Sequence, residues 1–128
     1  VQRGEGRMIA KIEIPANGSP AILYECPVDR VARITRILAY RHTTNTASTV
    51  DFFLVPFGDT QGVTFTFDQF TLTNAGDEGE VEMDGGEIIL DPGDTVWVET
   101  NTGAAGDDNA FLFYTEESKP PVAAQLRR

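Results

Sequence analysis

Hydrophobic and polar residues alternate along most of the chain, in short runs that turn residues separate. Met8, Ala10, Ile12 and Ile14 occupy every second position before the break at residues 15–20. A period of two places apolar side chains on one face of a β-strand. Runs of this kind recur along the chain without a convincing stretch of helical spacing. We therefore predict an all-β fold.

The pattern predicts about eight or nine strands separated by Gly-, Pro- and Asp-rich turns. They cover residues 8–14, 21–26, 31–41, 49–57, 63–73, 80–83, 87–90, 95–100 and 110–116. In one of them Val31, Ile34 and Ile37 lie three residues apart, a spacing that suits a helix or a strand with a β-bulge. The β-branched content of this segment favours the strand.

Short strands at this spacing favour a single-domain antiparallel β-sandwich, most simply a jelly roll of about eight strands. We expect the sandwich to comprise residues 8–117. Residues 1–7 are expected to form a flexible N-terminal arm, and residues 118–128, which contain two prolines and no acid, an extended C-terminal arm.

The strand at residues 50–57 is apolar on both faces. Phe53, Val55 and Phe57 lie on one side, and Phe52 and Leu54 lie on the other. A strand with one solvated face needs only one apolar row. We expect this strand to lie between two layers of the sandwich or at a subunit interface, as in a homotrimer.

Acidic and basic residues are segregated. Sixteen of the twenty acids lie between Asp51 and Glu117, a stretch without any Lys or Arg. The net charge of −10 argues against binding nucleic acid, because that affinity comes mainly from cations that neutralise phosphates. The cations nearest the two ends are expected to help attachment to a protein partner. These cations are Arg3, Arg7, Lys119, Arg127 and Arg128.

Residue counts leave little room for catalysis. The chain has one histidine, His42, one cysteine, Cys26, and three serines, none in a nucleophile-elbow sequence. A multi-histidine metal centre is excluded by count, and the abundant carboxylates fit solvated strand faces. We expect no enzyme activity, no cofactor and no metal. A cytoplasmic product without membrane contact is also expected, because no apolar run approaches the about 20 residues that span a bilayer.

One alternative class is a carbohydrate- or calcium-binding β-sandwich module. Asp107, Asp108 and Asn109 offer oxygen ligands in one loop, although they lack the ligand spacing of a dedicated calcium loop. Aromatic side chains provide surfaces on which a sugar can stack. The candidates are Trp97, for which core packing is the expected role, and Tyr24, Tyr40 and Tyr114.

Four segments together resemble small virion proteins of tailed bacteriophages, above all jelly-roll head decoration or cement proteins. A strand leads into a proline at residues 21–27, a long strand at 31–38 has the apolar triplet spacing, and 50–56 is apolar. In residues 85–97 an Asp-Pro-Gly-Asp turn precedes a strand. The same turn occurs in cupins, but this chain lacks their histidines.

This resemblance implies a non-enzymatic structural protein. It would bind the major capsid protein on the outer surface of a phage capsid and stabilise contacts between capsomers, commonly as a homotrimer. A tail, neck or fibre component is the alternative within the same class. The contact residues that we expect are Arg3, Arg7, Phe52, Phe53, Val55, Phe57, Lys119, Arg127 and Arg128.

Overall fold

The computed structural model describes residues 7–83, 88–102 and 106–119. Within these ranges the chain forms nine β-strands and one short 3₁₀ helix, so the predicted all-β fold is confirmed. The elements are β1 (Met8–Glu13), β2 (Ala21–Glu25), β3 (Arg30–Arg41), β4 (Ser48–Val55), η2 (Val63–Phe65), β5 (Thr66–Leu72), β6 (Glu78–Glu82), β7 (Ile88–Leu90), β8 (Thr95–Thr100) and β9 (Asp108–Ser118).

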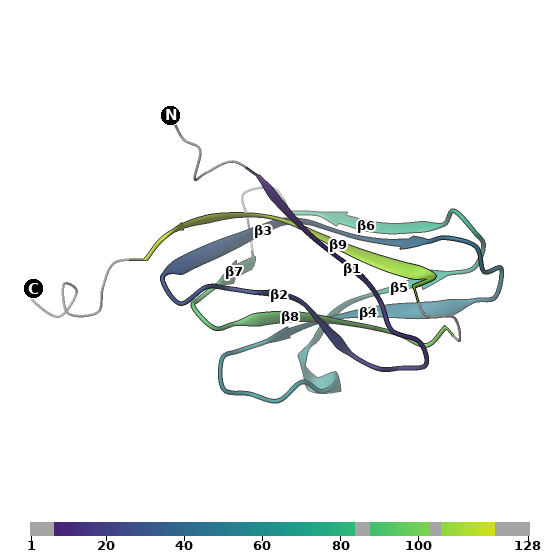
Figure 1. Cartoon of the computed structure of the whole chain (residues 1–128), viewed down its shortest axis with the longest axis horizontal. Coiled ribbons are helices and arrows are strands. Elements are labelled where there is room, and N and C mark those ends of the chain that lie inside the picture. Colours follow the sequence, from purple (N-terminus) through teal and green to yellow (C-terminus); the bar gives the residue numbers. More distant parts are fainter. Residues whose placement is uncertain (1–6, 84–87, 103–105, 120–128) are drawn as a thin grey trace, which may run out of the picture.

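The strands form two antiparallel sheets packed as a sandwich (Figure 1). One sheet has five strands in the order β1-β9-β3-β6, with β7 also paired to β3, and the other has four in the order β2-β8-β4-β5. Strands that neighbour one another within a sheet are mostly distant in sequence. This wrapping is that of a jelly roll in which β6 and β7 share the place of one strand.

The long strand β3 contains the predicted β-bulge. Its register against β9 shifts between Ile34 and Arg36, so that Thr35 is the extra residue. The Thr35 hydroxyl donates a hydrogen bond to the carbonyl of Phe113 at 3.1 Å. As a result Ile34 and Ile37, three residues apart, both reach the buried inner face.

The core lies between the inner faces of the two sheets. Phe52 of β4 is fully buried there and makes edge-to-face contacts with Phe67 and Phe70 of β5, at centroid distances of 6.2 and 5.8 Å. Phe70 also packs directly on Gly79 of β6, where a Cβ atom would collide with its ring. This contact closes the side of the sandwich between β5 and β6.

Most predicted strand ends differ from the structure by one or two residues, and two of the differences change how segments are placed. Residues 63–65 form η2 rather than a strand, and η2 contacts β4. The last strand is longer than expected, because Ser118 still pairs with Arg30 and the backbone N–H of Lys119 donates to the carbonyl of Asp29 at 2.9 Å. Ser118 and Lys119, expected in the C-terminal arm, therefore lie against the sandwich.

Candidate functional site

The outer face of the five-stranded sheet carries side chains in register across four strands. In one row Lys11 of β1, Phe111 of β9, Leu38 of β3 and Glu80 of β6 lie opposite one another. Successive residues of a strand point to opposite faces, so this row lies on the far side of the sheet from the buried Ala110 and Leu112. The row begins with a cation at one edge and ends with an acid at the other.

A neighbouring row consists of Ile9, Phe113, Arg36 and Glu82. The guanidinium carbon of Arg36 lies 4.7 Å from the centre of the Phe113 ring, and that of Arg7 lies 5.8 Å from it. The Nζ atom of Lys11 lies 5.9 Å from the centre of the Phe111 ring. Cations at these distances are attracted to the negative face of the ring.

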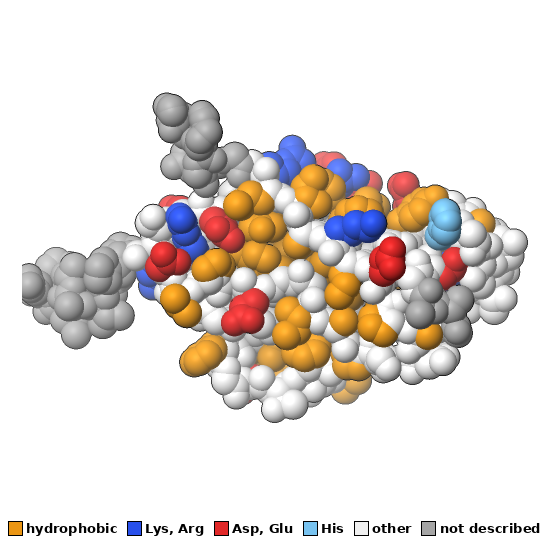
Figure 2. Space-filling view, in the orientation of Figure 1, with side chains coloured by type: hydrophobic (Ala, Val, Ile, Leu, Met, Phe, Trp, Pro, Cys, Tyr) orange, Lys and Arg blue, Asp and Glu red, His pale blue; other side chains and the backbone are white. Residues whose placement is uncertain are grey.

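We call this surface the aromatic-cationic face. It consists of Arg7, Ile9, Lys11, Arg36, Phe111 and Phe113. Ile9 is 59% exposed and the two phenylalanines are half-buried, so apolar area remains in contact with water. Figure 2 shows hydrophobic side chains next to Lys and Arg side chains over β1 and β9. Aromatic residues and Arg are enriched where proteins bind one another.

An open pocket of about 290 Å³ lies at one end of this face. Tyr40 and Phe111 supply aromatic surface, and Asn109 and His42 supply polar groups. The remaining lining residues are Lys11, Glu13 and Gly106. Such a mixture of aromatic and hydrogen-bonding groups suits a small polar ligand with apolar C–H surface.

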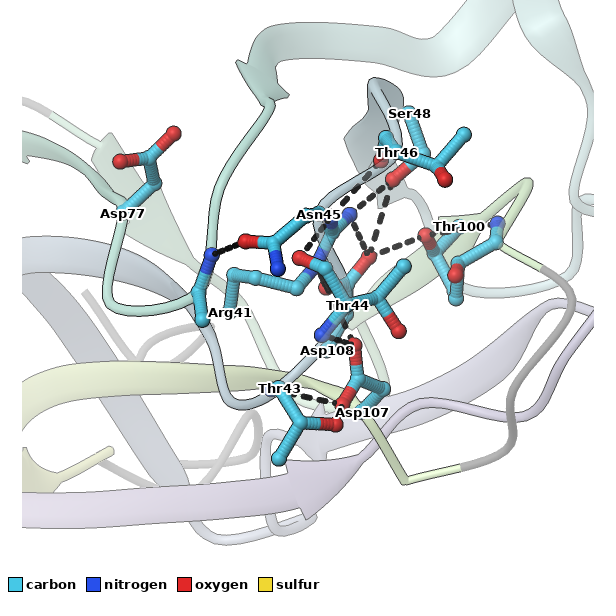
Figure 3. A network of polar contacts seen from close by, with 12 residues as sticks. Arg41, Thr43, Thr44, Asn45, Thr46, Ser48, Asp77, Thr100, Asp107 and Asp108 are labelled. Carbon is cyan, nitrogen blue, oxygen red and sulfur yellow. Dashed lines mark hydrogen bonds and ion pairs between the residues drawn. The ribbon is translucent and has the colours of Figure 1, made fainter.

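A buried polar network fixes the chain near this pocket (Figure 3). Arg41, at the end of β3, is fully buried and forms an ion pair with Asp108 at the start of β9. One Arg41 nitrogen donates to the Asp108 carboxylate at 3.1 Å, and another donates to the carbonyl of Thr46 at 2.9 Å. Arg41 also donates to Ser48, and the Thr100 hydroxyl donates to Asp108 at 2.6 Å. The network joins both sheets and the loop between β3 and β4.

Asp107 holds the same loop from the other side. Its carboxylate accepts hydrogen bonds from the backbone N–H groups of Thr43 and Thr44, each at 2.9 Å, and from the Thr43 hydroxyl at 2.6 Å. Burial alone would raise the pKa of Asp107, but these hydrogen bonds outweigh it and lower the pKa well below its ordinary value. Asp107 is therefore a carboxylate at neutral pH, and both of its oxygens already accept hydrogen bonds.

These contacts bear on the calcium alternative. Asp107 and Asp108 are directed at Arg41, Thr43, Thr44 and Thr100 rather than at a common point in a loop. Within the described ranges no three His, Cys, Asp or Glu side chains are arranged to hold a metal ion. Asp107 and Asp108, which were candidate calcium ligands in the sequence, thus bind Arg41 and the neighbouring threonines instead.

The predicted contact residues of β4 are inside the protein. Phe52, Phe53 and Val55 are 0, 1 and 2% exposed. Phe52 points into the core, whereas Phe53 lies opposite Trp97 on the outer face of the four-stranded sheet. Their role as partner contacts is corrected to internal packing. Phe57 alone stays available, because it is 78% exposed.

The predicted terminal cations are placed only in part. Arg7 lies on the aromatic-cationic face. Lys119 lies 3.5 Å from the carboxylate of Asp91 and is thus partly neutralised within the chain. Arg3, Arg127 and Arg128 lie outside the described residues.

The remaining candidate aromatic and nucleophilic residues are dispersed. The rings of Tyr24 and Tyr114 pack against each other at a tilt of 45° inside the sandwich, and the Tyr24 hydroxyl donates to Glu116 at 2.6 Å. Burial and this acceptor raise the pKa of Tyr24. Trp97 is half-buried on the outer face of β8, so its expected place in the core is wrong. Cys26 is buried, and burial raises the pKa of its thiol.

Several residues of the aromatic-cationic face were missed as contacts by the sequence interpretation. Phe111 and Phe113 alternate with Leu112 and Tyr114, so residues 110–114 are apolar on both faces, the same signal that drew attention to β4. Only the strand pairing shows that Lys11 and Arg36 flank these rings. That pairing is not visible in the sequence.

Comparison with known proteins identifies no family for this chain, since no family model and no curated protein matches it. Among solved structures the chain is similar to a pilus protein of Bacillus endospore appendages, with 16% identity, a TM-score of 0.47 and coverage of 94% of this chain and 93% of that chain.

Similarity of the same order extends to two other structures. One is a capsid protein of Ralstonia phage GP4, with 18% identity, a TM-score of 0.49 and coverage of 94% of this chain and 90% of that chain. The other is PirA, with 11% identity, a TM-score of 0.44 and coverage of 91% and 100%. At such identities and TM-scores these similarities carry no functional information.

No helix in the described ranges has the length and apolar character needed to cross a membrane.

Proposed function

We propose that the protein is a non-enzymatic structural component of a bacteriophage virion, which binds the outer surface of the capsid and stabilises contacts between capsomers. The major capsid protein is its proposed partner. The aromatic-cationic face carries this proposal, because it combines exposed apolar area with cations on a protein whose net charge is −10. Such a face suits an apolar surface that carries acidic groups.

The energetic contribution of this face comes mainly from its rings. Phe111 and Phe113 are half-buried, so a partner that covers them removes further apolar area from water at about 25 cal/mol per Å². Arg36 and Lys11 lie beside the rings, so a partner's carboxylate meets them close to apolar surface rather than in open solvent. The terminal cations Arg3, Lys119, Arg127 and Arg128 are proposed to add attraction at longer range.

The test is binding to particles that lack this protein. The double variant F111S/F113S should keep the fold, because both side chains point outward, and should lose at least ten-fold in affinity in a co-sedimentation assay. I22S/V63S is the matched control, because Ile22 and Val63 are 44% and 85% exposed on other elements. Equal binding by F111S/F113S and the wild type would refute attachment through this face.

Head and tail locations are separated by copy number. A number comparable with that of the major capsid protein, counted in purified particles, is expected for capsid decoration. A few copies per particle would instead indicate a tail, neck or fibre component.

A carbohydrate-binding module is the second candidate, and one observation favours it. The pocket between Tyr40 and Phe111 also holds Asn109 and His42, and sugars bind to aromatic surface beside hydrogen-bonding groups. Y40A should then abolish glycan binding while leaving particle binding unchanged. Absence of glycan binding by the wild-type protein on a glycan array would remove this candidate.

A further inference from the structure

One edge of the five-stranded sheet is formed by β1, and the opposite edge is formed by β6 and β7, which pair with successive parts of β3. In the described part of the chain β1 pairs only with β9, and β6 pairs only with β3. An edge strand presents backbone N–H and C=O groups on which another strand can pair. The question is which strand could pair there.

On the outer face of the sheet the two edges differ in charge. Arg7 and Lys11 lie along the β1 edge, which ends at the exposed Glu13. Glu78, Glu80 and Glu82 lie along the β6 edge, and all three are exposed. Edge charges of one sign normally oppose pairing between copies, because like charges meet. Here the cationic edge of one copy can lie against the acidic edge of the next copy.

The strand directions match as well. β1 is antiparallel to β9, β9 to β3 and β3 to β6, so β1 and β6 run in opposite directions. Suppose that a second copy is translated within the plane of the sheet, with no rotation. Its β1 then lies beside β6 of the first copy and runs antiparallel to it. The outer faces of both copies then point the same way, and their sheets continue one another.

The side-chain register decides which charges meet. The row of Lys11 ends at Glu80, and the row of Glu13 ends at Glu78, so a straight continuation into the next copy would place Glu13 opposite Glu78. A shift by two residues instead places Lys11 opposite Glu78 and Arg7 opposite Glu82, with Glu13 beyond the end of β6. Opposite charges directly across two strands stabilise their pairing. Glu80 already forms an ion pair with Arg36 in its own chain, whereas Glu78 and Glu82 have no ion pair among the described residues.

We propose that this protein associates side by side with a second copy of itself, β1 of one copy pairing with β6 of the next. The contact is between two different edges, so each copy keeps one edge free for another neighbour. Such a contact closes into a ring, a trimer among others, when the rotation between copies allows, and otherwise extends as a filament. It does not depend on which larger assembly the protein joins.

Complementary charge reversal tests this proposal. K11E makes the β1 edge acidic, and E78K/E82K makes the β6 edge basic while leaving the Arg36–Glu80 ion pair in place. The control E25K/D59K has the same change in net charge as E78K/E82K, at exposed residues away from both edges. Each full-length protein is studied by sedimentation velocity at low salt, alone and in mixtures.

We expect the wild type and E25K/D59K to self-associate with similar affinity. K11E and E78K/E82K should each lose at least ten-fold in affinity for self-association. Their equimolar mixture should associate again, because the acidic β1 edge of K11E can pair with the basic β6 edge of E78K/E82K. A wild-type protein that stays monomeric at all concentrations, or a mixture that fails to recover, would overturn the proposal. So would a control that loses as much affinity as E78K/E82K.

Hydrogen exchange provides an independent measurement on the unaltered protein. Amides of β1 and β6 should become better protected as the concentration of the wild type rises, whereas amides of the edge strand β2 should not change. Concentration-independent exchange in β1 and β6 would overturn the proposal even if the charge variants misfold. A loss of particle binding by F111S/F113S alone leaves these results unchanged, so the two proposals fail separately.

Discussion

Arg41 at the end of β3 and Asp108 at the start of β9 form an ion pair in the interior of the sandwich, where both side chains are 0% exposed. Each charge has additional hydrogen-bonding partners, which come from the four-stranded sheet and from the loop between β3 and β4. A buried pair of this kind contributes little net stability by itself, but the removal of one member leaves the other charge uncompensated. The pair therefore makes the fold sensitive to either residue.

Substitution of Arg41 should be strongly destabilising. R41A leaves the Asp108 carboxylate buried without its partner, which should lower the free energy of unfolding by about 3–5 kcal/mol. The control is R33A, because Arg33 pairs with Glu117 at 3.1 Å on the surface and such pairs contribute at most about 1 kcal/mol. Urea denaturation of the two variants distinguishes the cases. Similar losses for both would contradict a special role for the buried pair.

Asp107 should give the protein an acid-dependent stability. Its pKa is lowered in the folded state from the ordinary value of 3.8. A carboxyl group with a lowered folded-state pKa stabilises the fold above its unfolded pKa, and this stability is lost as the pH falls towards the folded pKa. D107N should therefore cost about 1–3 kcal/mol at pH 7, through the lost acceptors of Thr43 and Thr44.

The difference in unfolding free energy between the wild type and D107N should shrink as the pH falls below about 4. Denaturant titrations between pH 7 and pH 2 measure it. D59N is the control, since Asp59 is exposed and its substitution should leave the pH profile close to that of the wild type. A difference between the wild type and D107N that stays constant down to pH 2 would show that Asp107 retains its ordinary pKa.

Most strands could be predicted from the sequence because alternation is a local property. Which face of a strand lies inside is not local. In β3 the bulge at Thr35 reverses the alternation, so that Arg33 and Arg36 point outward while Arg41 joins Ile37 on the inner face. The spacing of Val31, Ile34 and Ile37 predicted the bulge, but nothing in the local sequence distinguishes the buried Arg41 from the partly exposed Arg33.

The interpretation of β4 shows the same limitation. Its two apolar faces were correctly recognised, but Phe53 is buried within its own chain rather than by a partner. Residues 63–65 have the β-branched and aromatic composition of a strand, but they form η2, which precedes β5 and contacts β4. Long-range contacts of this kind cannot be read from local patterns.

Phe53 and Phe57 should respond differently to truncation. Phe53 is 1% exposed and Phe57 is 78% exposed. F53A removes a packed ring and should lower the free energy of unfolding by about 3–5 kcal/mol, even at concentrations where the protein is monomeric. F57A should change it by at most about 0.5 kcal/mol. A small effect of F53A in the monomer would contradict the packing of this ring within the chain.

The contact between Gly79 and Phe70 should make β6 intolerant of a side chain. In G79A the added methyl group meets the Cβ and Cγ atoms of Phe70, which cannot move without shifting β5. Overpacking of this kind should cost about 1–3 kcal/mol. The second-site change F70L should recover part of the loss, which thermal unfolding of the double variant measures. G76A does not serve as a control, because Gly76 has a φ of 90° that disfavours any side chain.

Repulsion among exposed acids should limit the stability of the protein at neutral pH. Glu78, Glu80 and Glu82 alternate along one exposed strand face, and the net charge is −10. Sodium chloride should therefore raise the melting temperature by screening these charges. Calcium chloride at the same ionic strength should raise it no further, because Asp107 and Asp108 are engaged with Thr43, Thr44 and Arg41. Thermal melts in both salts, with and without chelator, provide the measurement, and a calcium-specific rise that chelator abolishes would show that carboxylates do converge on an ion.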